Sequence, residues 1–287
     1  MKKILVTGGN GQLGLELNDI TSKFPEYEFI FTDIDELDIT NKQQVELFFQ
    51  NNTPDFCINC AAYTAVDKAE DEPEKAELIN VYSSELLAKN CSKHNTSLIH
   101  ISTDYVFDGT NYQPYTEKDI PNPNSVYGNT KLQGEQRVMK YATKALIIRT
   151  SWLYSAYGNN FVKTMLRLGR QRDELGVVVD QVGTPTYAGD LAMAIMNIIS
   201  RNSIQKGSNI YHYSNEGVIS WYDFAQAIFR NSGISCNVNA IESSAFPAKA
   251  NRPFYSVLNK SKIKTDFNLS IPYWLDSLIK VLKQLKS

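Results

Sequence analysis

Cysteine is scarce in this sequence, and its scarcity excludes two classes of protein. Four cysteines in 287 residues are too few for the disulfide framework of a secreted scaffold. Cys57 and Cys60 form a C-x-x-C pair, but the chain has no second such pair or histidine pair to complete a zinc site. The pair falls in an apolar run that is typical of a buried strand, so we interpret both thiols as inert. Reduced cysteines of this kind indicate a cytoplasmic protein.

An excess of charge of one sign and a long apolar stretch are also missing. The net charge is -2 and no block of basic residues occurs, so nothing points to nucleic acid as a partner. No run approaches the roughly 20 apolar residues of a membrane span, and we expect no membrane contact. With 43% hydrophobic residues, the chain of 287 residues can instead bury a large core in one two-lobed unit or two domains.

The first half of the chain alternates strand and helix signals. Short apolar runs predict strands at 3–7, 27–32, 56–59, 97–102 and 145–150, and helical spacing predicts helices at 12–23, 41–51, 73–94 and 126–141. This alternation predicts an α/β fold of the Rossmann type, with a doubly wound parallel sheet whose strands end along one ligand-binding edge. We therefore expect residues 1–150 to form a dinucleotide-binding domain.

The pattern loosens after Trp152. Helices are predicted near 161–170, 187–201 and 221–232 and after residue 273, with strands at 175–179 and 210–213. We expect residues 151–287 to form mainly a smaller substrate-binding lobe, with segments near 175–201 returning to the Rossmann core. The long loop 103–124, rich in Pro, Asn, Asp and Tyr, leaves a strand at its carboxyl end and is predicted to form an active-site wall.

A glycine turn, Gly8-x-x-Gly11-x-x-Gly14, lies between the first strand and the first helix. Glycine permits a tight turn and lets backbone N–H groups approach a pyrophosphate at the helix N-terminus. Asp33 ends the second strand, where a carboxylate can accept hydrogen bonds from ribose hydroxyls and repel a 2′-phosphate. The pattern predicts NADPH or NADH as cofactor, with NADH favoured. The alternatives are a purely structural turn and a carboxylate that only caps it.

Tyr127 and Lys131 stand four residues apart in a predicted helix, so that their side chains share one face. A phenol has an unperturbed pKa of roughly 10. A neighbouring cation favours the phenolate and brings the group closer to useful acid–base chemistry. Together with the glycine turn, this pair predicts a hydride-transfer enzyme. The alternative for Tyr127 is a half-buried helix aromatic.

These motifs resemble the extended short-chain dehydrogenase/reductase family, and more narrowly its dTDP-4-dehydrorhamnose reductases. The similarity spans nearly the whole chain. Its blocks are Thr7–Gly14, Asn59–Glu70, Ser102–Gly109, Tyr127-x-x-x-Lys131, Arg149–Trp152 and Arg252-Pro253-x-x-Ser256-x-Leu258.

The resemblance implies reduction of the C4 ketone of dTDP-4-dehydro-6-deoxy-L-mannose to dTDP-L-rhamnose. It implies that Thr103 polarises the carbonyl, that Tyr127 donates the proton, and that Lys131 binds the nicotinamide ribose and lowers the phenol pKa. The implied cofactor-binding residues are Gly8, Asn10, Gly11, Gln12, Leu13, Gly14, Asp33, Asp38, Ile39, Ala62, Tyr63, Thr64, Tyr127 and Lys131. The implied substrate-binding residues are Thr103, Asp104, Tyr105, Trp152 and Arg252, and Asn80 would support the proton path.

Several of these residues have simpler alternatives. Trp152 would pack in the core, and Arg252 would form a surface ion pair. The family also suggests a divalent cation, Mg²⁺, held by glutamates at a homodimer contact. Glu16 matches one such position, but Asp190 stands near another and no C-terminal partner is found, so cation and dimer stay open. The three histidines share no metal-ligand spacing and are interpreted as structural.

Two other functions stay open. One is a regulatory nucleotide-binding subunit that resembles the β subunit of methionine adenosyltransferase. The other is a different nucleotide-sugar enzyme, such as an epimerase or a 4,6-dehydratase. Dehydratases of this family carry an Asp-Glu pair directly after the threonine, whereas here Thr103 is followed by Asp104 and Tyr105. The missing second carboxylate weakens the dehydratase alternative.

Overall fold

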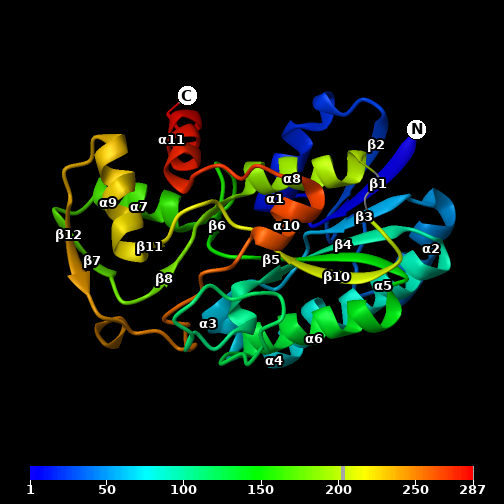
Figure 1. Cartoon of the computed structure of the whole chain (residues 1–287), viewed down its shortest axis with the longest axis horizontal. Coiled ribbons are helices and arrows are strands. Elements are labelled where there is room, and N and C mark those ends of the chain that lie inside the picture. Colours follow the sequence, from blue (N-terminus) through cyan, green and yellow to red (C-terminus); the bar gives the residue numbers. More distant parts are fainter. Residues whose placement is uncertain (202–203, 287) are drawn as a thin grey trace.

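A six-stranded parallel sheet forms the centre of the protein (Figure 1). The computed structural model describes residues 1–201 and 204–286, so residues 202, 203 and 287 of the expected second lobe lie outside the described residues. The strand order is β10-β5-β4-β3-β1-β2. The strands are β1 (Lys2–Thr7), β2 (Tyr27–Thr32), β3 (Phe56–Asn59), β4 (Ser97–Thr103), β5 (Lys144–Thr150) and β10 (Gly207–His212). The predicted Rossmann-type fold is confirmed.

The strand order reverses between β1 and β3. From β1 the chain goes outward to β2 and then crosses back to β3 on the other side of β1. In an open parallel sheet such a reversal leaves a crevice outside the carboxyl ends of the two strands, where ligands bind. Thr7 and Asn59 end these two strands. The topology therefore places the glycine turn at the expected binding crevice.

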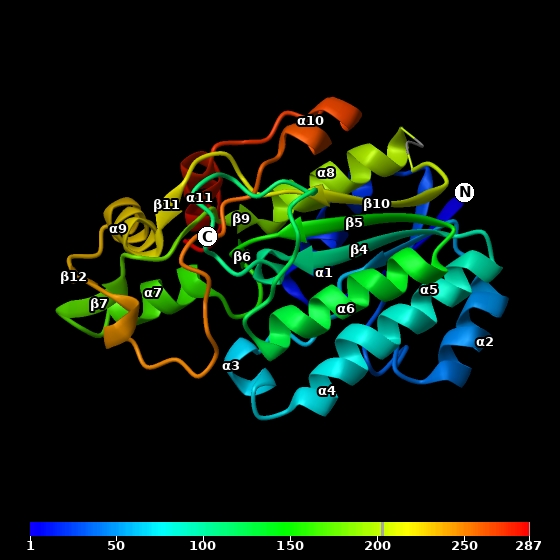
Figure 2. The same cartoon turned by 60° about the horizontal axis from the view of Figure 1, so that its bottom comes forward.

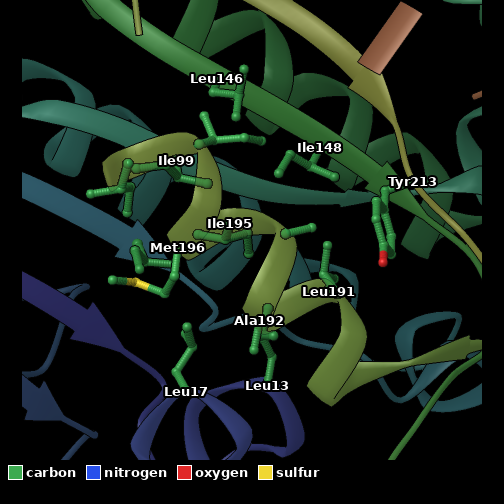
Figure 3. Packing of buried hydrophobic residues seen from close by; sticks show 14 of the residues in the cluster. Leu13, Leu17, Ile99, Leu146, Ile148, Leu191, Ala192, Ile195, Met196 and Tyr213 are labelled. Atoms are coloured by element: carbon green, nitrogen blue, oxygen red, sulfur yellow. The ribbon is translucent and has the colours of Figure 1, made fainter. Parts of the chain in front are cut away.

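Helices cover both faces of the sheet because successive strand residues point to opposite sides. Ile4 and Val6 pack with α1 (Gln12–Asp19) and α8 (Ala188–Ser200), a layer that Figure 3 shows from close by. Leu5, between them, packs in the cluster of the opposite face. That opposite face is covered by α2 (Lys42–Asn52), α5 (Ser83–Lys93) and α6 (Val126–Tyr141), while α10 (Ser261–Phe267) lies beside α8 and β10.

The predicted helix 73–94 is one continuous run of three segments, two α-helical and one π-helical. It comprises α4 (Pro73–Glu77), a π-helical turn (Leu78–Tyr82) and α5, after the short helix α3 (Val66–Ala69). At the π turn the chain approaches α6 closely, since a Cβ on Gly134 would lie 2.4 Å from the Asn80 carbonyl oxygen. Such turns inside α-helices are frequent at functional sites.

The second lobe, on the left in Figures 1 and 2, is built on an aromatic core with Phe224 and Trp274 near its centre. Its strands form two-stranded units, β12 with β7, β11 with β8, and β6 with β9. The elements are β6 (Leu153–Tyr154), α7 (Phe161–Gly169), β7 (Glu174–Val178), β8 (Val182–Gly183), β9 (Thr186–Tyr187), β11 (Ile219–Ser220), α9 (Trp221–Ser232), β12 (Asn237–Ile241) and α11 (Trp274–Gln284). Short 3₁₀ turns occupy Thr21–Lys23, Asp104–Val106 and Ser243–Ala245.

The structure corrects part of the expected return of residues 175–201 to the core. The first strand of that segment, β7, pairs with β12 in the second lobe and not with the large sheet. The later part of that segment does return, because α8 packs on the large sheet beside α1, and the strand that follows it, β10, pairs with β5. Apolar alternation predicts that a strand exists but carries no information about its partner. Within the described ranges, no helix combines the length and apolar character needed to cross a bilayer.

Candidate active site

The glycine turn forms a cradle that side chains would fill. Gly8 has φ +67°, and a Cβ there would lie 2.7 Å from the Ala61 backbone nitrogen. A Cβ on Gly14 would lie 2.5 Å from the carbonyl oxygens of Gly8 and Gly9. Gly11 caps α1 without any side-chain hydrogen bond, so the first N–H groups of the helix can bind an anion. The turn therefore fits a pyrophosphate.

Gln12, Leu13 and Asp33 are the next residues predicted to bind the cofactor. Gln12 Oε1 accepts a hydrogen bond from Asn160 Nδ2 at 2.9 Å, and the Leu13 side chain packs in the core, so that Leu13 can face a ligand only through its backbone. Asp33 lies at the same edge, where its oxygens accept from the backbone N–H groups of Asn10 at 3.0 Å and Ile34 at 2.9 Å. Its carboxylate thus lies beside the turn, as predicted.

Two further residues that the resemblance implies for the cofactor, Asp38 and Ile39, have partners within the protein. The Asp38 carboxylate accepts from the backbone N–H and the hydroxyl of Thr40, at 2.9 and 2.7 Å. The Ile39 side chain is buried in the core with Val45 and Phe49. The Asp38 carboxylate is therefore bound within its own loop, and the Ile39 side chain lies in the core.

The loop after β3 is held by a buried amide. Asn80 Oδ1 accepts from the Tyr63 backbone N–H at 2.9 Å, and its Nδ2 donates to the Tyr63 carbonyl at 3.2 Å and to Thr130 Oγ1 at 3.1 Å. Ala62 and Thr64 flank Tyr63; Ala62 is half-buried and Thr64 is exposed. Asn80 therefore positions the predicted cofactor loop against α6.

Thr103, Tyr127 and Lys131 come together under this loop. Thr103 ends β4, and the other two lie on the face of α6 that packs on the sheet. They are 5%, 9% and 3% exposed, so all three are buried. The Thr103 hydroxyl faces the Tyr127 phenol, and Lys131 Nζ donates to the Ile101 carbonyl of β4 at 2.7 Å.

Burial has the largest effect on the pKa of both Tyr127 and Lys131. Burial raises the pKa of Tyr127 to about 12, with a smaller rise from Asp104 and a lowering by Thr103. Burial lowers the pKa of Lys131 to about 8, although Glu135 acts in the opposite direction. The phenol pKa in the protein without ligands is therefore set mainly by burial, and the expected lowering by Lys131 together with the charge of the oxidised nicotinamide stays a prediction.

Asp104 and Tyr105 follow Thr103 and extend the site. The Tyr105 ring meets the Tyr127 ring edge to face, with centroids 5.5 Å apart. Asp104 is 1% exposed and accepts from Thr103 Oγ1 at 3.0 Å. Burial raises the pKa of Asp104 to about 6, against smaller lowering effects of the Ser256 and Thr103 hydroxyls.

Trp152 and Arg252 border a separate part of the site. The Trp152 ring stacks on Trp221 with centroids 3.6 Å apart, and its backbone has φ +48°. Arg252 makes a two-point ion pair with Asp67, at 2.7 Å through Nη2 and 3.2 Å through Nη1. Beside them lies a pocket of about 410 Å³. It is lined by Phe161, Thr164, Met165, Leu168, Arg172, Leu175, Gly176, Val177, Val178, Gln181, Trp221, Phe246 and Arg252.

Two residues below Lys131 were missed by the sequence reasoning. Glu135 is fully buried and accepts from Arg149 Nε at 2.9 Å and Nη2 at 2.6 Å, and from Ser102 Oγ at 2.5 Å. Glu135 follows Lys131 by one helical turn, as Lys131 follows Tyr127, so the spacing could have found it. Nothing local could have identified Arg149 as its partner, since that residue lies on β5.

The suggested metal position is engaged within the chain. Glu16 accepts from Ser155 Oγ at 2.5 Å and from the Tyr187 hydroxyl at 2.9 Å. Asp190 accepts from Asn215 Nδ2 at 2.8 Å. No group of three or more His, Cys, Asp or Glu side chains in the described ranges could hold a metal ion.

Comparisons with known proteins agree with this geometry. The profile of the RmlD substrate binding domain family matches residues 1–287. A dTDP-4-dehydrorhamnose reductase of Aggregatibacter actinomycetemcomitans is 43% identical over 288 residues, which cover 97% of each chain. This similarity confirms the resemblance seen in the sequence.

Two solved structures superpose on nearly the whole chain. A dTDP-4-dehydrorhamnose reductase from Clostridium acetobutylicum ATCC 824 is 44% identical with a TM-score of 0.94, covering 99% of this chain and 100% of that one. The enzyme from Bacillus anthracis str. Ames, solved in complex with NADP, is 40% identical with a TM-score of 0.94 and the same coverage. The chain therefore belongs to the RmlD substrate binding domain family.

Proposed function

We propose that this protein reduces the C4 ketone of dTDP-4-dehydro-6-deoxy-L-mannose to give dTDP-L-rhamnose, with NADPH or NADH as reductant. The observation that carries the proposal is the convergence of Thr103, Tyr127 and Lys131 next to the glycine cradle. The choice of substrate is supported by the relatives, since all three proteins compared above are dTDP-4-dehydrorhamnose reductases.

The residues at the end of β1 and β2 fit a dinucleotide. The N-terminus of α1 would bind its pyrophosphate, and Asp33 its adenosine ribose. Lys131 uses one of its three N–H donors on Ile101, which leaves two for the nicotinamide ribose. When bound, the reduced nicotinamide supplies a hydride. The Bacillus anthracis relative binds NADP, whereas the charge of Asp33 favours NADH here.

Thr103 and Tyr127 act on the carbonyl oxygen. Negative charge develops there as C4 is reduced, and the Tyr127 proton is delivered to it while the Thr103 hydroxyl donates a hydrogen bond. Proton transfer leaves a phenolate on Tyr127. The Lys131 ammonium, one helical turn away, is the cation that stabilises this phenolate.

The pocket beside Trp221 suits the nucleotide part of the substrate. Its walls are largely apolar and aromatic, as a pyrimidine ring requires, and Arg252 stands at its border. A guanidinium binds phosphate oxygens with two parallel hydrogen bonds. Arg252 would exchange its contact with Asp67 for the diphosphate, while Asp104, Tyr105 and Trp152 contact the sugar.

The deciding experiment is an assay with the 4-keto sugar nucleotide that follows the loss of reduced-nicotinamide absorbance. Turnover with NADH and NADPH establishes the reductase, and the ratio of kcat/KM for the two establishes the preference. Asp33→Asn should shift that ratio toward NADPH. No oxidation by the wild-type protein, despite tight nucleotide binding, would favour the regulatory-subunit alternative.

The divalent cation and the homodimer that the family suggests each have their own test. Because Glu16 is engaged by Ser155 and Tyr187, we expect EDTA to leave kcat unchanged. Light scattering at assay concentration measures the oligomeric state. An EDTA-sensitive rate that Mg²⁺ restores would show that the cation is required.

A further inference from the structure

Asp104 is the least expected group in the site. It is a carboxyl group that is 1% exposed and lies directly beside the hydroxyl that must polarise the substrate. Its Oδ2 atom is buried without a hydrogen bond of good geometry in the described part of the chain, although the Ser256 hydroxyl lies nearby. An ionised carboxylate with one buried oxygen unsatisfied is costly.

The Thr103 hydroxyl has a single hydrogen, and in the structure that hydrogen is used. Thr103 Oγ1 donates to Asp104 Oδ1 at 3.0 Å and accepts from the Tyr105 backbone N–H at 3.2 Å. A hydroxyl that donates to a carboxylate cannot also donate to a ketone. With Asp104 ionised, Thr103 is therefore turned away from the substrate.

Protonation of Asp104 reverses this hydrogen bond. A carboxylic acid donates its own hydrogen to Thr103 Oγ1, which frees the hydroxyl hydrogen for the substrate oxygen. We propose, on the basis of the reductase function above, that Asp104 works in its protonated form as the positioning residue that directs the Thr103 hydroxyl toward the C4 carbonyl. No proton is consumed at Asp104, because the proton of the product alcohol comes from Tyr127.

The surroundings of Asp104 favour the neutral acid. The groups that face it are the Tyr127 phenol from α6, the Tyr105 phenol of its own segment and the Ser256 hydroxyl from the C-terminal segment. The Arg252–Asp67 ion pair acts on Tyr105. A substrate bound over the site removes more water and brings a negative diphosphate, and both effects favour the protonated carboxyl further.

Asp104→Asn tests the inference, because an amide is permanently neutral and can donate to Thr103. For the wild type we expect kcat to fall up to tenfold per pH unit as the carboxyl ionises in the substrate complex. Asp104→Asn should lose this fall because an amide does not ionise, while the fall in rate caused by deprotonation of Lys131, whose pKa is lowered to about 8, remains. Asp104→Leu, which cannot donate, should lose at least about tenfold in kcat at every pH. These expectations assume the hydrogen-bond contribution usual for one catalytic donor.

Asp108→Asn is the matched control. Asp108 lies on the same loop with its carboxylate bound to Thr110 and Asn122, and its replacement should leave the pH profile unchanged. A second readout needs no turnover. Infrared difference spectra between the wild type and Asp104→Asn, with NADP⁺ and dTDP bound at neutral pH, should show a protonated carboxyl band.

The outcomes separate this inference from the proposed reductase function. Wild-type turnover combined with an inactive but folded Asp104→Asn would overturn the inference alone, since the carboxylate form would then be required. An infrared carboxylate band in place of the acid band would overturn it as well. If the wild type does not turn over, the reductase proposal fails and the infrared band still reports the state of Asp104.

Discussion

Two buried glutamates, in two regions of the molecule, meet different partners. Glu135, under the sheet edge, is fully buried and paired with the Arg149 guanidinium. Glu16, at the joint between α1 and the second lobe, is 4% exposed and accepts from the hydroxyls of Ser155 and Tyr187. Burial raises the pKa of Glu16, against the smaller lowering effect of these hydroxyls. Glu135 thus faces a cation, whereas Glu16 faces neutral hydroxyl donors.

This difference matches what each region does. Below the site, Glu135 raises the pKa of the buried Lys131 and so helps to keep that ammonium charged. At the joint, one face of α1 binds the loop that leads to α7. Protonation of Glu16 there removes no charge that the proposed reaction needs. The joint contacts are Gln12 with Asn160, Glu16 with Ser155, and Asp19 with Tyr157. The ion pair near the site supports a charged Lys131, whereas the hydroxyls at the joint can also bind a neutral carboxyl group.

The largest loss of activity should come from a substitution of the proposed proton donor, Tyr127. Tyr127→Phe removes the proton donor, and we expect kcat to fall roughly 10²- to 10⁴-fold with the urea midpoint nearly unchanged. Tyr82→Phe, at a 41% exposed tyrosine of the π-helical turn, is the matched control and should keep full activity. A Tyr127→Phe protein with the wild-type rate would show that the proton comes from elsewhere.

Breaking the ion pair between Glu135 and Arg149 should cause the largest loss of stability. Glu135→Gln leaves the buried Arg149 without its counter-charge and should cost about 3–5 kcal/mol in the free energy of unfolding. The double variant Glu135→Gln with Arg149→Met should recover part of that loss in urea titrations. The pKa of Lys131 should also fall in Glu135→Gln. The decline in rate that follows deprotonation of Lys131 should therefore begin at lower pH. An additive double variant would contradict the pairing.

At the joint, the equivalent substitution should change the pH dependence of stability. The pKa of Glu16 is raised on folding, so its contribution is complete below the unfolded value near 4.5 and is lost as pH rises through the folded value. Glu16→Gln should flatten this fall in urea midpoints measured from pH 4 to 8. Glu46→Gln, on an exposed helix face, is the control. A steeper fall in Glu16→Gln would mean that the carboxylate is the favoured form.

The smallest loss of stability should come from an exposed hydrogen bond at the joint. Tyr157 donates to Asp19 at 2.8 Å in an exposed position, so Tyr157→Phe should cost no more than about 1 kcal/mol. Tyr187→Phe removes a buried donor to Glu16 and should cost about 1–3 kcal/mol. If thermal or urea unfolding showed the same loss of stability for both variants, burial would not make one hydrogen bond contribute more than the other.

Much of the large lobe could be predicted from local patterns. The predicted bounds of β2, β3 and α6 agree with the structure, because apolar runs and helical spacing are properties of consecutive residues. The partners of β7 and β10 could not be predicted, since pairing depends on segments far apart in the chain. The π turn at Asn80 was also missed; it lies where α6, distant in the sequence, approaches closely.

The sequence alone determined the Rossmann-type fold, the glycine cradle and the shared face of Tyr127 and Lys131, because these follow from residue type and spacing within one segment. Only the tertiary structure decided the protonation of the buried groups. Ser155 and Tyr187 lie 139 and 171 residues from Glu16, and Arg149 reaches Glu135 from another element. Burial and distant partners set the relative free energies of charged and neutral forms, so the chemistry of each carboxyl group emerges only when the chain is folded.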